Sequence, residues 1–175
     1  MNPHPDELAR IAGEIESGTD PYQVPQELLE EPPDKAPVNK SLYARIAGMS
    51  VGEKIKLALL GNREARALLV RDTNRLIARF VLRNPRLTED EVLMIARNRN
   101  IDSEILREIG EHKQWPRNYQ IRLALVNNPK TPLATALHFV SLLHERDLRF
   151  LAKSKNVSST IVSQARRILA QRGKM

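Results

Sequence analysis

The sequence predicts an all-α protein of about nine or ten short helices, preceded by an acidic arm that is rich in proline. From about Asn39 onward, apolar residues recur three and four positions apart, which is the spacing of an amphipathic helix. Residues that start or stop helices interrupt this pattern at roughly regular intervals. No stretch alternates apolar and polar residues as a half-buried strand does, and aromatic residues make up only 4% of the chain.

Residues 1–37 form the predicted arm. They hold seven of the eleven prolines, and each proline fixes φ and removes an amide donor, so no long helix can run through them. One short helix is expected in the stretch PDELARIAGEIE, where Leu8, Ile11, Ala12 and Ile15 share one face. The rest of the arm is expected to be largely flexible, and residues 38–175 are expected to form the helical-repeat domain.

The arm and the domain differ in charge. Residues 1–37 contain nine acidic and two basic residues, a net charge of −7, whereas residues 38–175 contain 26 basic and 12 acidic residues, a net charge of +14. Such an asymmetry indicates an acidic tail on a basic body. The arm is therefore one candidate ligand of the basic surface, in cis or in trans.

Several short motifs predict where the helices of the domain begin and end. Ser50–Glu53 and Thr88–Glu91 match the capping box, in which two side chains satisfy free amides at a helix start. Thr131 is expected to cap a helix whose first residue is Pro132. Asn84 and Asn128 each precede a proline and are expected to stop a helix, because a residue before proline disfavours the α conformation.

Between these boundaries, three sets of apolar residues have helical spacing and are predicted to face the core. They are Ile101, Ile105, Leu106 and Ile109; Leu133, Ala136, Leu137 and Val140; and Ile161, Val162, Ala165, Ile168 and Leu169.

The chain contains one phrase twice, in FVLRNPRLTEDEVL (80–93) and ALVNNPKTPLATAL (124–137). The two Asn-Pro pairs lie 44 positions apart, within the period of about 40–47 residues of HEAT and armadillo repeats. The sequence therefore predicts an α-solenoid of this type, whose repeats bury a face against one another.

The stretch RLALVNNPKTPLATALHFV resembles the bacterial variant leucine-rich repeat, an all-helical relative of HEAT repeats, at Arg122, Leu123, Ala124, Asn128, Pro129, Thr131 and Pro132. The earlier copy keeps Asn84, Pro85 and Thr88 but lacks the second proline. From about Ser41 to Leu169 the chain is also similar to HEAT-like proteins without an assigned activity. Some members of the repeat family carry an iron–sulfur cluster on cysteines, and this chain has no cysteine. The resemblance thus implies a fold and no catalytic residue.

The sequence contains no pattern typical of an enzyme. Without cysteine it has no disulfide, thiolate metal site or cysteine nucleophile, and His138 and His144 lie six positions apart rather than at the i, i+4 spacing of paired zinc ligands. Phosphate-loop, dinucleotide and nucleophile-elbow patterns are also missing. We therefore expect no catalytic residue, cofactor or metal; the HEAT-like alkylpurine DNA glycosylases are an enzyme alternative by fold analogy alone.

The start of the chain does not resemble a signal peptide, and no apolar run approaches the about 20 residues of a membrane-spanning helix. A cytoplasmic protein without membrane insertion is expected.

Basic side chains are the main functional signal. Arg75, Arg79 and Arg83 follow one another at i, i+4 and i+8, a spacing that is mildly unfavourable unless an acidic group meets it. The full set of expected contacts on the basic face is Arg71, Arg75, Arg79, Arg83, Arg149, Lys153, Lys155, Arg166 and Arg167. Trp115 and Tyr119, which flank Pro116, either seal a gap between repeats or stack on a ligand.

Four explanations of this basic face remain open: a solvated surface, a surface covered by the chain's own arm, a site for an acidic protein segment, or a site for a phosphate backbone. We expect a non-enzymatic helical-repeat adaptor whose arginines bind an acidic protein segment, with the chain's own arm as a candidate cover for them. The alternative is a HEAT-like nucleic-acid-binding protein that uses the same face, although the usual aromatic and zinc signatures are missing.

Overall fold

A computed structural model describes residues 3–33 and 40–173 of the chain. Within these residues it contains eleven α-helices, three 3-10 helices and no strand, which confirms the all-α prediction and exceeds the expected nine or ten helices. The chain divides into two compact units, Met1–Thr88 and Glu89–Met175. The boundary predicted between residues 37 and 38 lies outside the described residues.

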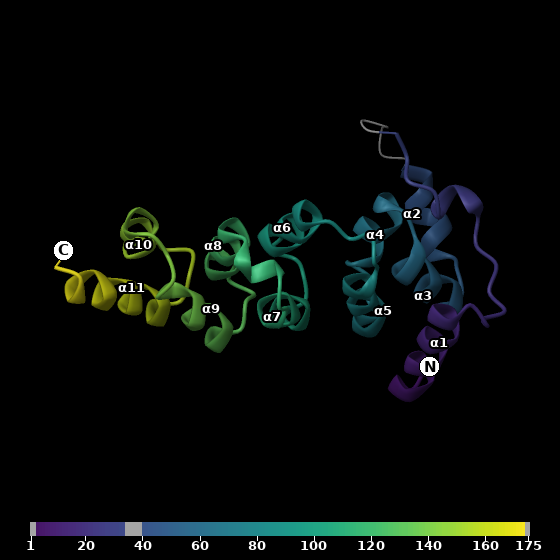
Figure 1. The fold of residues 1–175 in the computed structure, drawn as a ribbon, viewed down its shortest axis with the longest axis horizontal. Helices are drawn as coiled ribbons and strands as arrows, with labels where there is room; N and C mark the ends of the chain where they lie inside the picture. The colour runs from purple at the N-terminus through teal and green to yellow at the C-terminus, as the bar shows by residue number, and fades with distance from the viewer. Residues whose placement is uncertain (1–2, 34–39, 174–175) are drawn as a thin grey trace. The chain divides into compact units, whose positions relative to one another are not determined.

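The N-terminal unit is built around a central helix, α3 (Val51–Leu60), which packs against the N-terminal helix α1 (Pro5–Ser17) and against α4 (Arg63–Leu69) and α5 (Arg75–Phe80) (Figure 1). Shorter elements complete the unit: η1 (Gln26–Leu28), α2 (Lys40–Ala47) and η2 (Val81–Arg83). Ile55, Leu57 and Ala58 of α3 are fully buried, so the other helices cover α3 on several sides.

The described part of the predicted arm is packed into this unit. Leu8, Ile11, Ala12 and Ile15 are buried, as the helical spacing predicted. After α1 the chain continues as a strap, residues 20–31, which lies on α3 and on the turn that follows it. Leu28 of the strap is only 2% exposed, and Asn62 donates its side-chain amide to the carbonyls of Glu27 and Glu30, each at 3.0 Å.

The expectation that this part of the arm is largely flexible therefore differs from the packing that the structure describes. The physical reason is that the large apolar side chains in the described part of the arm are buried or half-buried and that several of its carbonyl groups accept hydrogen bonds from side chains, which together offset the entropy of ordering the segment. Proline spacing predicts where helices break, but it does not predict whether the broken chain packs.

The strap makes a tight contact at Gly52, which supports a first testable prediction. A Cβ atom added at Gly52 would lie 2.0 Å from the ring of Tyr22, whereas one added at Gly13 in α1 would meet nothing within 4 Å. We expect Gly52→Ala to displace the Tyr22 ring and lower the free energy of unfolding by about 1–2 kcal/mol. Gly13→Ala should instead raise it by about 0.5–1 kcal/mol, because alanine favours the helix.

Urea unfolding of both variants beside the wild-type chain checks the pair. A Gly52→Ala protein as stable as the wild type would contradict this prediction, because it would show that the Tyr22 ring can move without a loss of stability.

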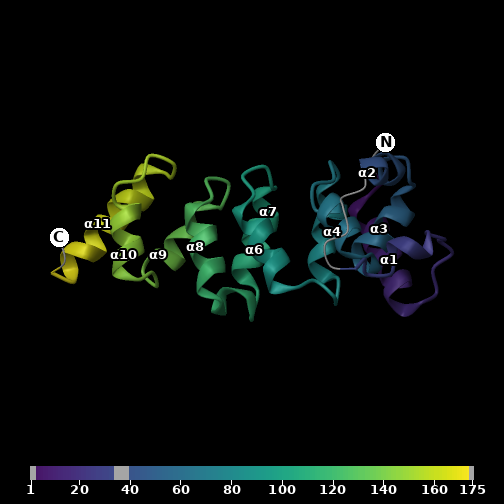
Figure 2. The same cartoon turned by 90° about the horizontal axis from the view of Figure 1, so that it is seen from above.

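The C-terminal unit consists of paired helices in two rows. Figure 1 shows α6 (Glu89–Arg97), α8 (Tyr119–Asn127) and α10 (Glu145–Leu151) in one row, and α7 (Ser103–Glu111), α9 (Leu133–Val140) and α11 (Ser159–Gln171) in the other. In the turned view of Figure 2, α6, α8 and α10 follow one another side by side. Helix α6 packs against α8, and α9 packs against α11. A 3-10 turn, η3 (Trp115–Arg117), precedes α8.

Most of the predicted core positions of this unit are buried. All four residues of the set from Ile101 to Ile109 are at most 2% exposed, and in α11 only Val162 of the predicted stripe is half-buried rather than buried. In α9 the prediction is wrong for Leu133, which is 45% exposed because the helix begins at this residue and its first turn lies at the surface.

The two Asn-Pro pairs stop helices, as predicted, and they do so with the same additional contact. Asn84, directly after η2, donates its side-chain amide to the carbonyls of Ala58 and Gly61 at 3.0 and 3.1 Å, at the end of α3. Asn128, directly after α8, donates to the carbonyls of Ala96 and Asn98 at 2.7 and 3.0 Å, at the end of α6. In each case the asparagine Oδ1 accepts the amide two residues ahead, from Arg86 or Lys130. We call this arrangement the asparagine clamp.

The predicted helix starts have different outcomes. The capping box of Ser50 and Glu53 is confirmed, and its backbone and side-chain hydrogen bonds to Ser50 lower the pKa of Glu53. Helix α6 begins directly after Thr88, as expected. The cap predicted at Thr131 is wrong: Pro132 occupies the cap position, and the buried Thr131 hydroxyl has no hydrogen-bond partner among the described residues.

Candidate basic interaction surface

The predicted basic residues fall into both units. Arg71, Arg75, Arg79 and Arg83 belong to the N-terminal unit, and Arg149, Lys153, Lys155, Arg166 and Arg167 belong to the C-terminal unit. The expected ridge is broken, because α5 ends at Phe80 and Arg83 follows in the tighter turn η2. Arg83 forms an ion pair with Glu16 of α1 and lies over the Phe80 ring, 5.2 Å from its centroid.

Acids of the arm pair with basic residues of the N-terminal unit, in cis. Asp20 lies 2.9 Å from Lys56, and Glu27 lies 2.5 Å from Arg45. Glu31 lies 2.6 Å from Arg66, whose side chain is only 3% exposed. The residues of this unit, 1–88, include 13 basic and 12 acidic residues, so the unit is nearly neutral with a net charge of +1.

Glu31 is the most connected of these acids. Its burial alone would raise its pKa, but hydrogen bonds from the Arg66 guanidinium and from the backbone N–H of Arg63 outweigh that effect, so the pKa of Glu31 lies below its ordinary value. Arg86 contributes a further contact at 3.5 Å and also donates to the carbonyl of Leu29 at 2.7 Å. The carboxylate thus holds the end of the strap against two arginines.

The C-terminal unit carries the remaining charge. Residues 89–175 include 15 basic and nine acidic residues, a net charge of +6, and no acid follows Asp147. The positive charge that the whole chain shows is therefore concentrated in this unit after folding.

One basic surface of this unit surrounds an exposed aromatic ring. Phe150 on α10 is 68% exposed, and Arg146 lies over its ring, 5.9 Å from the centroid. Together with Glu145, Arg149 and Lys153 these residues line a shallow hollow of about 600 Å³, which we call the α10 patch. Arg149 is held by Glu145 at 2.5 Å, one turn earlier on the same helix.

Sequence reasoning predicted Arg149 and Lys153 of this patch but missed Arg146 and Phe150. Arg146 lies between Glu145 and Asp147 in the sequence, which hid its charge, and an aromatic residue at helical spacing is more often buried than exposed. Of the other predicted residues, Arg166 donates its Nε to the carbonyl of Ala152 at 3.0 Å, whereas Lys155 and Arg167 are exposed and line neither this hollow nor the next.

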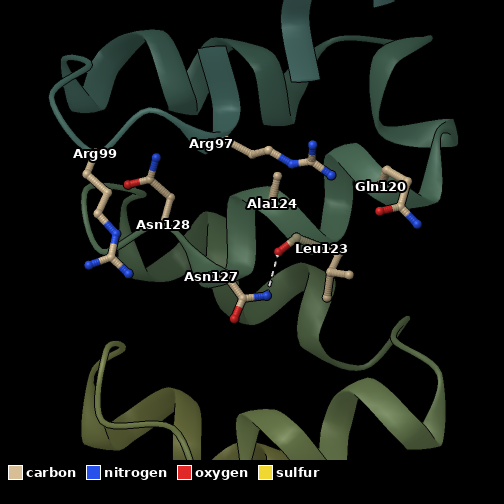
Figure 3. A pocket seen from close by; sticks show the side chains of 7 residues that line it. All are labelled: Arg97, Arg99, Gln120, Leu123, Ala124, Asn127 and Asn128. Carbon is tan, nitrogen blue, oxygen red and sulfur yellow. Dashed lines mark hydrogen bonds between the residues drawn. The ribbon is translucent and has the colours of Figure 1, made fainter. Parts of the chain in front are cut away.

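A second hollow, of about 260 Å³, lies between α6 and α8, and we call it the α6–α8 hollow (Figure 3). The guanidinium groups of Arg97 and Arg99 approach it from the end of α6 and the following turn, and Gln120, Leu123 and Asn127 face it from α8. Both arginines are exposed, and neither forms an ion pair with a carboxylate of the described residues. The spacing Arg-Asn-Arg at a helix end is the signal by which the sequence could have indicated this site.

Trp115 and Tyr119 have intramolecular stacking partners. Trp115 stacks on His112 with 3.7 Å between ring centroids, and Tyr119 stacks on His144 at 4.1 Å. The Tyr119 hydroxyl donates to Asp147 at 2.5 Å and accepts the backbone N–H of His144 at 3.0 Å, which ties the start of α8 to the start of α10. Burial and the bond to Asp147 raise the pKa of Tyr119. These contacts favour the sealing role over stacking on a ligand.

Among the described residues, no group of three or more histidine, aspartate or glutamate side chains is placed to hold a metal ion. Likewise, none of the helices in the described ranges 3–33 and 40–173 is long and apolar enough to cross a membrane.

Comparison with family models, with curated proteins and with solved structures found no match to this chain. The resemblance to variant leucine-rich repeats therefore stays a prediction.

Proposed function

We propose that this protein is a non-enzymatic helical-repeat adaptor that binds an acidic protein segment through the basic surface of its C-terminal unit. The observation that carries the proposal is the distribution of charge after folding. The arm's acids pair inside the nearly neutral N-terminal unit, whereas the C-terminal unit has a net charge of +6. A HEAT- or armadillo-like solenoid is part of this proposal, supported by the two rows of helices and the repeated asparagine clamp.

The α10 patch has the composition of a protein-binding surface. Arg146 and Arg149 offer planar guanidinium groups that pair with carboxylates, and Phe150 offers an exposed apolar side chain of the kind that anchors interfaces. A partner segment that combines acidic residues with one apolar residue fits this set of groups.

The same patch supports one alternative, nucleic-acid binding. An exposed aromatic ring beside three basic side chains is also the arrangement on which a base stacks while its phosphates meet cations. This mode differs from the first in its salt dependence, because releasing counterions from phosphates makes the affinity fall steeply as salt rises.

Fluorescence anisotropy with the full-length protein separates the two. The probes are a labelled glutamate-rich peptide with one central leucine and a labelled single-stranded DNA, each titrated over a salt series. We expect the peptide to bind and Arg146→Glu/Lys153→Glu to weaken binding by about tenfold, or about 1.4 kcal/mol. Phe150→Ser should weaken binding of the peptide by a smaller factor, because it removes the apolar contact.

The matched control is Lys113→Glu/Arg117→Glu, which changes the charge equally at exposed residues that line neither hollow. Equal loss in both double variants would mean that only net charge matters and would contradict the α10 patch as the site. Tight DNA binding with a steep salt slope, beside weak peptide binding, would replace the adaptor with the nucleic-acid alternative.

A further inference from the structure

The asparagine clamp identifies two equivalent places in the chain. Asn84 closes the end of α3 from the far end of the α5–η2 segment, and Asn128 closes the end of α6 from the far end of α8. In both units the two helices that the clamp joins pack against each other, α3 with α5 and α6 with α8. Asn84 and Asn128, 44 residues apart in the repeated phrase, are therefore equivalent in structure as well as in sequence.

In the N-terminal unit this pair of helices has a cover. Helix α1 packs against both α3 and α5, with four apolar residues buried and its polar face outward. It is acidic, with Asp6, Glu7, Glu14 and Glu16 against one basic residue, Arg10. Its Glu16 pairs with Arg83. Within the chain itself, therefore, an acidic amphipathic helix, α1, covers the pair α3 and α5.

In the C-terminal unit the equivalent pair is open. Asn127, which is equivalent to Arg83, lines the α6–α8 hollow, and no carboxylate of the described residues occupies the place that Glu16 takes on Arg83. The positive groups here are Arg97 and Arg99, and half-buried Leu123 lines the same hollow. On α6 the large apolar side chain of Met94 is 65% exposed.

We propose that the α6–α8 hollow binds an acidic amphipathic helix of the partner protein, in the manner in which α3 and α5 bind α1. The helix places carboxylates against Arg97 and Arg99, whose guanidinium groups pair with no acid of the described residues, and its apolar stripe meets Leu123. The choice of an acidic helix over other occupants rests on charge complementarity and on the cis example of α1. The proposal depends on the proposed function, since it names the form that the acidic protein segment takes at this second hollow.

The test measures binding of a helical probe to the full-length protein by fluorescence anisotropy. The probe is a labelled peptide with the sequence of α1, PDELARIAGEIES, carrying Gly13→Ala to favour the helix. A second peptide replaces its four acids with the corresponding amides. We expect the acidic peptide to bind the wild-type protein and to bind Arg97→Glu/Arg99→Glu at least about tenfold more weakly, with Arg97→Gln/Arg99→Gln in between. The amide peptide should bind all proteins weakly.

Lys113→Glu/Arg117→Glu is again the matched control and should retain wild-type affinity, and circular dichroism verifies that every variant is folded. Unchanged affinity in the Arg97/Arg99 variants would overturn the inference, because the peptide would then occupy another place, such as that of α1. If the helical peptide fails to bind while the glutamate-rich peptide still binds, the inference is also overturned, but the adaptor proposal stays intact. If neither peptide binds, the proposed function itself fails.

Discussion

Replacing Asn128 with alanine should lower the free energy of unfolding of the C-terminal unit by about 3 kcal/mol, at about 1 kcal/mol for each of three lost hydrogen bonds. Asn128 is only 4% exposed, and its side chain serves the carbonyls of Ala96 and Asn98 and the amide of Lys130. Water cannot replace a donor at a buried helix end without rearrangement, so the carbonyls stay unsatisfied in the variant.

The neighbouring Asn127 provides the control, since it is exposed and its side-chain amide donates to the carbonyl of Leu123 in its own helix. Asn127→Ala should change stability by less than about 0.5 kcal/mol. Trp115 is the only tryptophan and lies in the C-terminal unit, so its fluorescence during urea unfolding reports on this unit. Equal stability of the two variants would show that the clamp does not hold α6 and α8 together.

Asn128→Asp sharpens the test. Aspartate keeps the acceptor for Lys130 but turns the two donor contacts into a carboxylate that faces two carbonyl oxygens. It should be at least as destabilising as alanine if the donated bonds are the important part of the clamp.

Glu31→Gln should lower the free energy of unfolding of the N-terminal unit by about 2 kcal/mol, because it removes a charged hydrogen-bond partner of the buried Arg66. The Arg66 side chain is 3% exposed and remains charged at any ordinary pH. Glu31 itself is 39% exposed, so water compensates part of the loss and the effect stays below that of a fully buried pair. Glu30→Gln, one residue earlier, changes an exposed side chain whose carboxylate accepts a hydrogen bond from Gln26, and it should have little effect.

The same variant gives a pH dependence with a defined sign. The pKa of Glu31 is lowered from 4.5 in the folded protein. Its contribution to stability is therefore fully present above pH 4.5 and is lost as the pH falls through the lower pKa of the folded state. The difference in stability between wild type and Glu31→Gln should therefore be largest near neutral pH and shrink in acid. Urea unfolding followed by circular dichroism at several pH values measures it, and a difference that does not change with pH would contradict the role of this carboxylate.

The sequence determined the all-α class, most helix boundaries and most of the core by itself, because these depend on local spacing. Helical spacing alone places Leu8, Ile11, Ala12 and Ile15 on one face, whatever they pack against. A residue before proline likewise disfavours the α region whatever surrounds it. Asn84 and Asn128 were therefore recognisable as helix stops. Their second role, as donors to backbone carbonyls 26 and 32 residues earlier in the chain, depends on tertiary packing and has no local signal.

Only the tertiary structure decided which charged side chains pair within the protein and which stay exposed. Net charges of −7 and +14 in two segments suggested an acidic arm that guards a basic body, but local sequence does not show which acid meets which base. Packing of the apolar residues of α1 and of Leu28 brings the arm's acids to Lys56, Arg66 and Arg83. It leaves Arg97, Arg99, Arg146 and Lys153 exposed in the other unit. Ion pairs join residues far apart in the chain, so their pattern follows from how the apolar surfaces are buried and not from the order of charges along the sequence.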